Sequence, residues 1–197
     1  MPEPSFQERV RILWEERAIM DVMHRYSRGF DRGDVELVKS AYWPDALEDH
    51  HTFCGLSGPM CDVFHDLIED NFLTAQHHIT NTVIELDGDT AHVESYCFAV
   101  CVKRESHELD VVGGRYIRRL EKRDGEWRIA AGVLVADWAP DAETTRELMA
   151  TGAVVTRERT RRGGPAHAGP HAQRKPIASG RGASGLAGSS PDGSSSL

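Results

Sequence analysis

The chain of 197 residues contains no apolar run near the ~20 residues that a membrane-spanning helix requires. Its first residues, Met-Pro-Glu-Pro-Ser, also lack the basic and apolar regions of a secretory signal peptide. A composition of 40% hydrophobic and 27% charged residues is typical of soluble globular proteins. We therefore expect a cytoplasmic protein that does not contact a membrane.

Motifs for several common chemistries are missing as well. The sequence has no glycine-rich phosphate loop, nucleophile elbow or dinucleotide fingerprint. Of its four cysteines, Cys97 and Cys101 fall in a strand-like run, where they would stand roughly 13 Å apart, too far for a disulfide. Five possible metal ligands lie close together in the sequence: His50, His51, Cys54, Cys61 and His65. Their spacing lacks the two ligand pairs of a typical zinc site, so we expect neither a cofactor nor a metal.

Basic residues are scarce in the body of the chain. From Thr151 onward there are seven Arg and Lys and two Asp and Glu, so this segment carries about +5 and the first 150 residues about −13 of the total of −8. An acidic body argues against nucleic acid as a partner. After Val155 there is almost no apolar material to offset the entropy of ordering. The sequence predicts a domain over residues 1–150 and a disordered tail over residues 151–197.

The first 150 residues divide into helices followed by strands. The segment Ser5-Phe-Gln-Glu8 is a capping box that opens a long amphipathic helix. Asp34 is a plausible N-cap for a second helix over residues 35–42, and a third helix is expected within residues 62–72. A last short helix is expected to begin near Asp141.

Between the third helix and that last one, the apolar period changes to two. Four strands are expected, joined in pairs by tight Asp-Gly turns: residues 77–86, 91–104, 109–122 and 126–135. Helices first and an antiparallel meander afterwards indicate an α+β fold, with the helices on one face of a curved sheet. On residues 91–104 one face is uniformly small and includes Cys97 and Ala99. Such a face either lets a helix pack closely or leaves space for a ligand.

Two short motifs about fifty residues apart carry the candidate chemistry: Tyr26-Ser-Arg-Gly-Phe-Asp31 and His77-His78-Ile-Thr-Asn81. The first places a phenol and a carboxylate at the end of the long helix, and the second places an imidazole at the start of a strand. If the fold brings them together in an apolar cavity, Asp31 can orient His77 for acid–base chemistry. The simpler alternative is a structural pair that holds the helix end against the sheet.

These residues resemble the SnoaL-like group of the nuclear-transport-factor-2-like superfamily over roughly residues 8–138. The resemblance rests on the order and spacing of short pieces: Tyr26, Phe-Asp31-Arg-Gly-Asp34, Trp43-Pro-Asp45, His77-His78-Ile-Thr-Asn81, Asp87-Gly-Asp, Gly113-Gly-Arg-Tyr116, Arg123-Asp-Gly-Glu-Trp127 and Asp137-Trp138. It implies a cone, in which a strongly curved antiparallel sheet wraps a pocket and N-terminal helices close the open side. Relatives include scytalone dehydratase, bile-acid 7α-dehydratase and polyketide cyclases.

The resemblance also implies roles for the motif residues. His77 would be the general base that removes a proton from carbon, and Asp31 would fix its tautomer. Tyr26 would donate a hydrogen bond to the departing oxygen or to an enolate, with Tyr116 as a second donor. One imidazole would then serve as base and afterwards as acid in a syn elimination. His78 alternates to the opposite face, where we expect a packing or surface role.

Two places depart from the family pattern. Where many relatives carry an Arg that projects into the pocket, this chain has Ala130-Ala131-Gly132, and Arg118 stands where relatives often have Asp. The missing Arg disfavours an anionic substrate and predicts a wider, more apolar pocket.

The sequence thus predicts a cofactor-independent, dehydratase-like lyase. Its substrate would be a neutral, apolar, hydroxylated ring compound such as a polyketide, terpenoid or steroid-like molecule, bound by Tyr116, Cys97 and Ala99. An isomerase or cyclase with the same dyad is an alternative, as is a non-catalytic ligand-binding or scaffold subunit. We expect a homodimer or homotrimer, because a partner usually covers the outer face of such a sheet.

Overall fold

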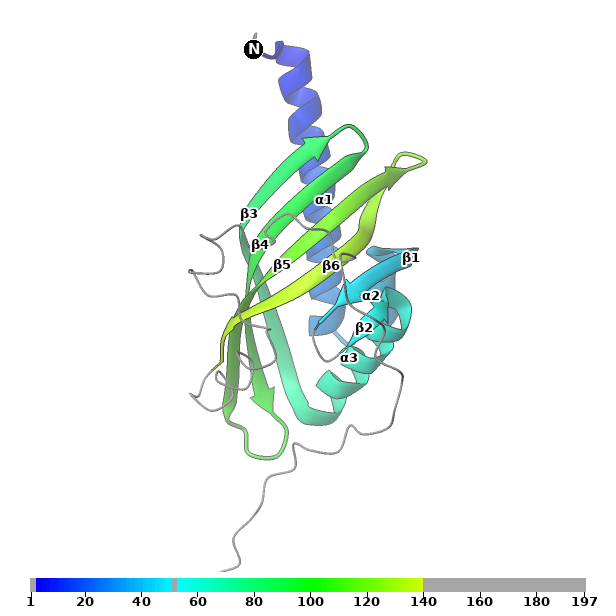
Figure 1. Cartoon of the computed structure of the whole chain (residues 1–197). Coiled ribbons are helices and arrows are strands. Elements are labelled where there is room, and N and C mark those ends of the chain that lie inside the picture. Colours follow the sequence, from blue (N-terminus) through cyan, green and yellow to red (C-terminus); the bar gives the residue numbers. More distant parts are fainter. Residues whose placement is uncertain (1–2, 51–52, 140–197) are drawn as a thin grey trace, which may run out of the picture.

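The computed structural model describes residues 3–50 and 53–139 of the chain. It begins with a long helix, α1 (Phe6–Asp31), whose N-cap Ser5 accepts a hydrogen bond from the backbone of Glu8, as the capping box predicts. The buried side chains of α1 recur at spacings of three and four from Ile19 to Phe30, which is the pattern of a helix with one face in the core. Its first turns extend past the end of the sheet (Figure 1).

Two shorter helices follow, α2 (Val35–Ser40) and α3 (Ser57–Asn71). The second helix is two residues shorter than the sequence pattern predicts, and the third begins five residues earlier than predicted. The predicted helix near Asp141 and the predicted tail lie outside the described residues. In the described part, no helix combines the length and the apolar composition needed to cross a membrane.

Within the part of the chain that the structure describes, six strands form one sheet. Their bounds are β1 (Tyr42–Asp49), β2 (Cys54–Leu56), β3 (Phe72–Asp87), β4 (Thr90–Lys103), β5 (Leu109–Arg123) and β6 (Glu126–Trp138). The order across the sheet is β2-β1-β6-β5-β4-β3, and the four predicted strands form the antiparallel part from β6 to β3. The α+β fold with helices against a curved sheet is confirmed.

The first two strands correct the sequence-based prediction. Strand β1 pairs parallel to β6, so the sheet is mixed and not purely antiparallel. The four predicted strands did not include this segment, in which Pro44 cannot donate to a sheet ladder. The structure accommodates it through an irregular register between Tyr42 and Leu47. Strand β3 also begins at Phe72, five residues before the predicted start.

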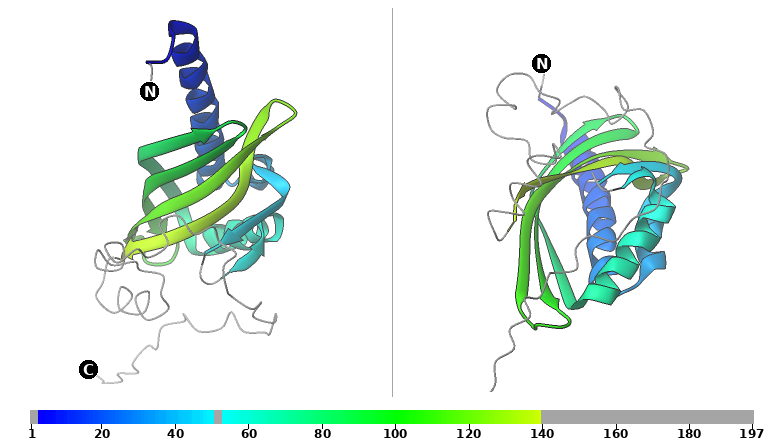
Figure 2. Two further views of the ribbon diagram at one scale, coloured as in Figure 1. Left: turned by 45° about the horizontal axis from the view of Figure 1, so that its top comes forward. Right: turned by 60° about the horizontal axis from the view of Figure 1, so that its bottom comes forward.

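The sheet bends around the helices and leaves the cone open (Figure 2). A register shift between Thr80 and Val83 interrupts β3, and Asn81 adopts a positive φ of 49° there. Asparagine tolerates this left-handed conformation better than most residues, so the last residue of the His77–Asn81 motif serves the bend in the strand. The core lies between the concave face and α1.

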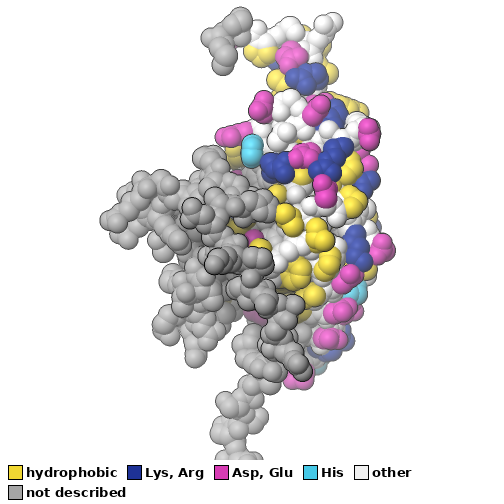
Figure 3. All heavy atoms as spheres, turned by 45° about the vertical axis from the view of Figure 1, so that its right-hand side comes forward, with side chains coloured by type: hydrophobic (Ala, Val, Ile, Leu, Met, Phe, Trp, Pro, Cys, Tyr) yellow, Lys and Arg dark blue, Asp and Glu magenta, His cyan; other side chains and the backbone are white. Residues whose placement is uncertain are grey.

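The convex face of the sheet carries exposed aromatic side chains. Tyr96 and Phe98 alternate with the inward-facing residues of β4, and the ring of Phe98 lies 5.9 Å from that of Trp138 on β6. On the face of the molecule drawn in Figure 3, charged side chains of both signs surround a group of exposed hydrophobic ones.

Candidate active site

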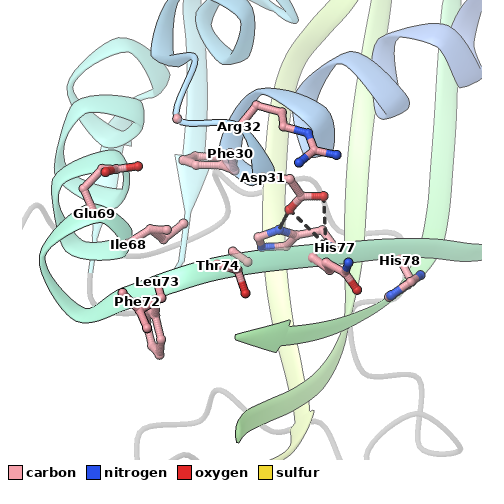
Figure 4. A pocket seen from close by; sticks show the side chains of 13 residues that line it. Phe30, Asp31, Arg32, Ile68, Glu69, Phe72, Leu73, Thr74, His77 and His78 are labelled. Atoms are coloured by element: carbon pink, nitrogen blue, oxygen red, sulfur yellow. Dashed lines mark hydrogen bonds and ion pairs between the residues drawn. The ribbon is translucent and has the colours of Figure 1, made fainter. Parts of the chain in front are cut away.

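Asp31 and His77 meet at the junction of α1 and β3. The Nδ1 atom of His77 lies 2.6 Å from Oδ1 of Asp31, and the backbone N–H of His77 donates to both carboxylate oxygens, at 3.0 and 3.1 Å (Figure 4). An ionised carboxylate only accepts hydrogen bonds, so the ring proton is placed on Nδ1. The Nε2 atom then carries the lone pair that a general base needs.

The corner between α1 and α2 fixes the position of Asp31. The backbone N–H of Arg32 bonds to carbonyls in the last turn of α1, and Gly33 takes a positive φ of 65°. A Cβ on Gly29 would lie 2.6 Å from a methyl group of Val38, so glycine is what lets α2 pack directly on the last turn of α1.

Five residues singled out by the sequence share one inner cavity of about 240 Å³ inside the cone. The wall of this inner cavity includes Tyr26, His77, Cys97, Ala99 and Tyr116. All four of Ala91, Val93, Cys97 and Ala99 on the small face of β4 are buried in the core, and of these Cys97 and Ala99 border the inner cavity.

A second, outer cleft of about 630 Å³ lies on the other side of the dyad, between α3, the end of α1 and β3 (Figure 4). It contains Asp31, Arg32 and Glu69, and it is more polar than the inner cavity. Both spaces are bordered by the same four side chains: Phe30, Ile68, Phe72 and His77. The imidazole of His77 therefore stands at the boundary between an apolar interior and a polar cleft. His78 is exposed and points away from the dyad, as alternation along the strand predicts.

The phenols of Tyr26 and Tyr116 form a pair on the wall of the inner cavity. Their hydroxyl oxygens are 3.4 Å apart and their rings meet edge to face. Burial raises the pKa of Tyr26 to about 12, although the nearby Arg118 acts in the opposite direction. Burial likewise raises the pKa of Tyr116 well above its ordinary value. Both phenols are therefore protonated and able to donate hydrogen bonds at neutral pH.

A buried guanidinium lies behind this pair, and sequence reasoning did not foresee its burial. The Cζ atom of Arg118 stands 3.8 Å from the ring centre of Tyr26 and 4.2 Å from that of Tyr116. Its Nε lies 3.6 Å from Oε1 of Glu48, which also accepts a 2.7 Å hydrogen bond from Tyr42. Burial opposes the charge of Arg118, but the facing phenols and Glu48 hold its pKa above the usual value.

This guanidinium also corrects the expectation of a wider pocket at Gly132. Arg118 on β5 is the cross-strand partner of Gly132 on β6. A Cβ at Gly132 would lie 2.6 Å from the carboxyl carbon of Glu48. The place that an arginine on β6 would occupy is thus filled by Glu48, and the neighbouring strand supplies the buried arginine.

The potential metal ligands of the sequence do not form a site in the described residues. Among residues 3–50 and 53–139, no group of three or more His, Cys, Asp or Glu side chains is placed to hold a metal ion. One of the five, His50, instead borders the inner cavity and lies beside Glu48. Sequence reasoning did not single out Glu48, because charged residues are usually exposed and its strand contains a proline.

Comparison with known proteins places the chain in one family. A family model described as a SnoaL-like domain matches residues 11–132. No curated protein matches the chain. Among solved structures, a putative scytalone dehydratase from Novosphingobium aromaticivorans is 23% identical with a TM-score of 0.61, covering 66% of this chain and 88% of that one.

Two further solved structures share the fold. A hexachlorocyclohexane dehydrochlorinase from Novosphingobium barchaimii is 19% identical with a TM-score of 0.59, covering 66% of this chain and 91% of that one. A protein of unknown function from Mycobacterium tuberculosis is 22% identical with a TM-score of 0.60, covering 76% of this chain and 94% of that one. At these identities the likeness establishes the fold and leaves the activity open.

Proposed function

The chain belongs to the SnoaL-like domain family, and from this premise we propose that it is a cofactor-independent lyase that removes water from a neutral, hydroxylated ring compound. The observation that carries the proposal is the 2.6 Å contact of His77 with Asp31 at the wall of an apolar cavity. A structural pair would not need its imidazole to border an empty space. Two of the structural relatives bear the names of a dehydratase and a dehydrochlorinase, which also catalyse eliminations.

The proposed reaction follows from the placement of the groups. Nε2 of His77 takes a proton from a carbon next to a carbonyl, and the electron pair of that C–H bond forms the new double bond as the C–O bond on the next carbon breaks. The departing hydroxyl takes a proton back from the imidazolium of His77 and leaves as water. Asp31 stabilises the imidazolium that forms. Tyr26 and Tyr116 donate hydrogen bonds to the carbonyl oxygen as negative charge develops on it.

The inner cavity limits the size and charge of the substrate. An apolar protein cavity of about 150 Å³ holds one benzene, so the 240 Å³ cavity suits a compound of one or two rings. A steroid-sized molecule would extend past Phe30 and Phe72 into the outer cleft. No Lys or Arg borders the inner cavity among the described residues, which supports a neutral substrate.

The first prediction concerns Asp31→Asn. The amide of asparagine can accept a hydrogen bond from Nδ1–H, but it carries no negative charge to stabilise the imidazolium. Turnover should therefore fall by a factor on the order of 10²–10⁴. Ligand binding and the unfolding midpoint should change little, because the side chain keeps its shape. The assay is water loss from a panel of one- and two-ring β-hydroxyketones, followed by absorbance of the conjugated product. Asp34→Asn, three residues further on, is the matched control, since asparagine also serves as an N-cap.

Two outcomes would contradict this proposal. Turnover retained by Asp31→Asn would exclude the dyad as the base, and a large loss of stability would favour a structural pair. An isomerase or cyclase begins with the same proton abstraction, so it would respond to the same variant but yield a product that retains the oxygen.

The homodimer or homotrimer stays a prediction, supported by the exposed rings of Tyr96, Phe98 and Trp138 on the convex face.

A further inference from the structure

The inner cavity is bordered by a second imidazole that is also paired with a carboxylate. His50 directly follows β1, the strand that carries Glu48. Nε2 of His50 lies 3.3 Å from Oε2 of Glu48, and both side chains are buried. His50 and His77 border the same cavity, so one space contains two His–carboxylate pairs.

The two imidazoles stand at the two ends of an arc of aromatic rings along the cavity wall. Starting from His77, the ring centres of Phe30, Tyr26, Tyr116 and His50 follow at 6.2, 5.1, 5.4 and 6.4 Å. All of these side chains border the inner cavity. A ring compound in the inner cavity can therefore contact the two phenols and both imidazoles.

The carboxylate of Glu48 is held in its charged form although it is fully buried. Burial disfavours the charge, but His50, Arg118 and the hydroxyl of Tyr42 outweigh it and bring the pKa of Glu48 below its usual value. Taking a carboxylate and a guanidinium out of water is costly. Such costly groups concentrate at functional sites. The group beside Glu48 that borders the cavity is His50.

We propose that His50 is the acid of the elimination, a role that rests on the proposed lyase function. The acid and the base of the reaction are then two different residues, His50 and His77. His77 takes the proton from carbon, the C–O bond breaks, and His50 gives its proton to the departing hydroxyl, which leaves as water. The positive charge of protonated His50 is stabilised by Glu48. Afterwards His77 releases its proton to water in the outer cleft, and His50 takes one from water, so that both return to their starting states.

The test uses two leaving groups on one two-ring skeleton, 3-hydroxy-1-tetralone and 3-chloro-1-tetralone. Hydroxide needs a proton to leave, whereas chloride does not. His50→Gln should therefore lower turnover of the hydroxy compound on the order of 10²-fold or more, and that of the chloro compound at most a few-fold. His77→Gln should lower both, because both need the base. His92→Gln, which removes an exposed imidazole from β4, is the matched control for the loss of a histidine.

The results of these assays distinguish a failure of the His50 assignment from a failure of the lyase proposal. Equal losses on the two compounds in His50→Gln would mean a structural role, and no loss on either would mean no role; both overturn the assignment while the function of His77 stands. Unchanged turnover in His77→Gln would overturn the lyase proposal itself. If the wild type converts neither compound, binding of 1-naphthol is followed by NMR of the histidine rings. Signals of His50 that do not respond to bound 1-naphthol would overturn contact between His50 and a ligand.

Discussion

At the scale of single residues, the interior contains a buried guanidinium, that of Arg118. It lies on β5, one strand away from the position near Gly132 on β6 where many relatives carry an arginine. Arg118 and Gly132 are cross-strand partners, so an arginine on β5 and a glycine on β6 are complementary choices. Glycine at 132 leaves room for the carboxylate of Glu48, and Glu48 in turn balances Arg118 and contacts His50. The absence of a side chain at 132 is thus part of the buried charge network.

Gly132→Ala tests this arrangement. The added methyl group would lie 2.6 Å from the carboxyl carbon of Glu48, and a buried, hydrogen-bonded carboxylate cannot move away freely. We expect the free energy of unfolding to fall by about 1–3 kcal/mol, as in other overpacked cores. Gly58→Ala in α3 is the control, because nothing lies within 4 Å of its added Cβ and alanine favours a helix. Equal stability of the two variants in urea titrations would contradict the tight contact at Gly132.

At the scale of elements, the N-caps of α1 and α2 differ in how much of the fold depends on them. Asp34 accepts a 2.9 Å hydrogen bond from the backbone of Leu37 and starts α2, which packs on the turn that contains Asp31. Ser5 caps the projecting end of α1. The side chain of Glu15 joins α1 to the sheet by accepting hydrogen bonds from Lys122 and Trp127. The turns before Glu15 can therefore fray without unfolding the domain.

The caps give a paired prediction. Asp34→Ala should lower the free energy of unfolding by about 1 kcal/mol, whereas Ser5→Ala should lower it by no more than a few tenths. Asp34→Asn should match the wild type, because asparagine caps equally well. Urea titrations of the three variants measure these differences. A larger loss for Ser5→Ala than for Asp34→Ala would mean that the projecting turns are part of the cooperative unit.

The same elements explain how far the sequence predicts the structure. The capping box and the period of α1, and the period of two in β3 to β6, depend on neighbours along the chain, so pattern is sufficient to find them. Strand β1 was not predicted, because it depends on a parallel partner far away in sequence and contains Pro44. The contact of Asp31 with His77 was anticipated from the two motifs and the family resemblance, although His77 lies within β3 and not at its start. Glu48 and Arg118 were missed because their burial follows only from the pairing of β1 with β6 and of β6 with β5.

At the scale of the whole molecule, the interior contains three buried phenols. Burial raises the pKa of Tyr26 to about 12 and those of Tyr42 and Tyr116 well above the ordinary value near 10. The unfolded chain therefore loses these protons near pH 10, while the folded chain keeps them. A raised folded-state pKa contributes stability that is complete below the unfolded pKa and is lost as the pH rises through the folded one.

The free energy of unfolding should accordingly fall between about pH 10 and about pH 12. Two pK units for Tyr26 alone correspond to about 2.7 kcal/mol over that interval. Urea titrations at a series of pH values from about 9 to about 12 measure the slope. Tyr26→Phe should flatten it, whatever its effect on absolute stability, because phenylalanine has no proton to lose. Tyr96→Phe, which removes an exposed phenol from the convex face, is the matched control. If the slope of Tyr26→Phe equals that of the control, the phenol of Tyr26 already reaches solvent in the folded protein, and the buried phenol pair on which the proposed chemistry depends is not present in solution.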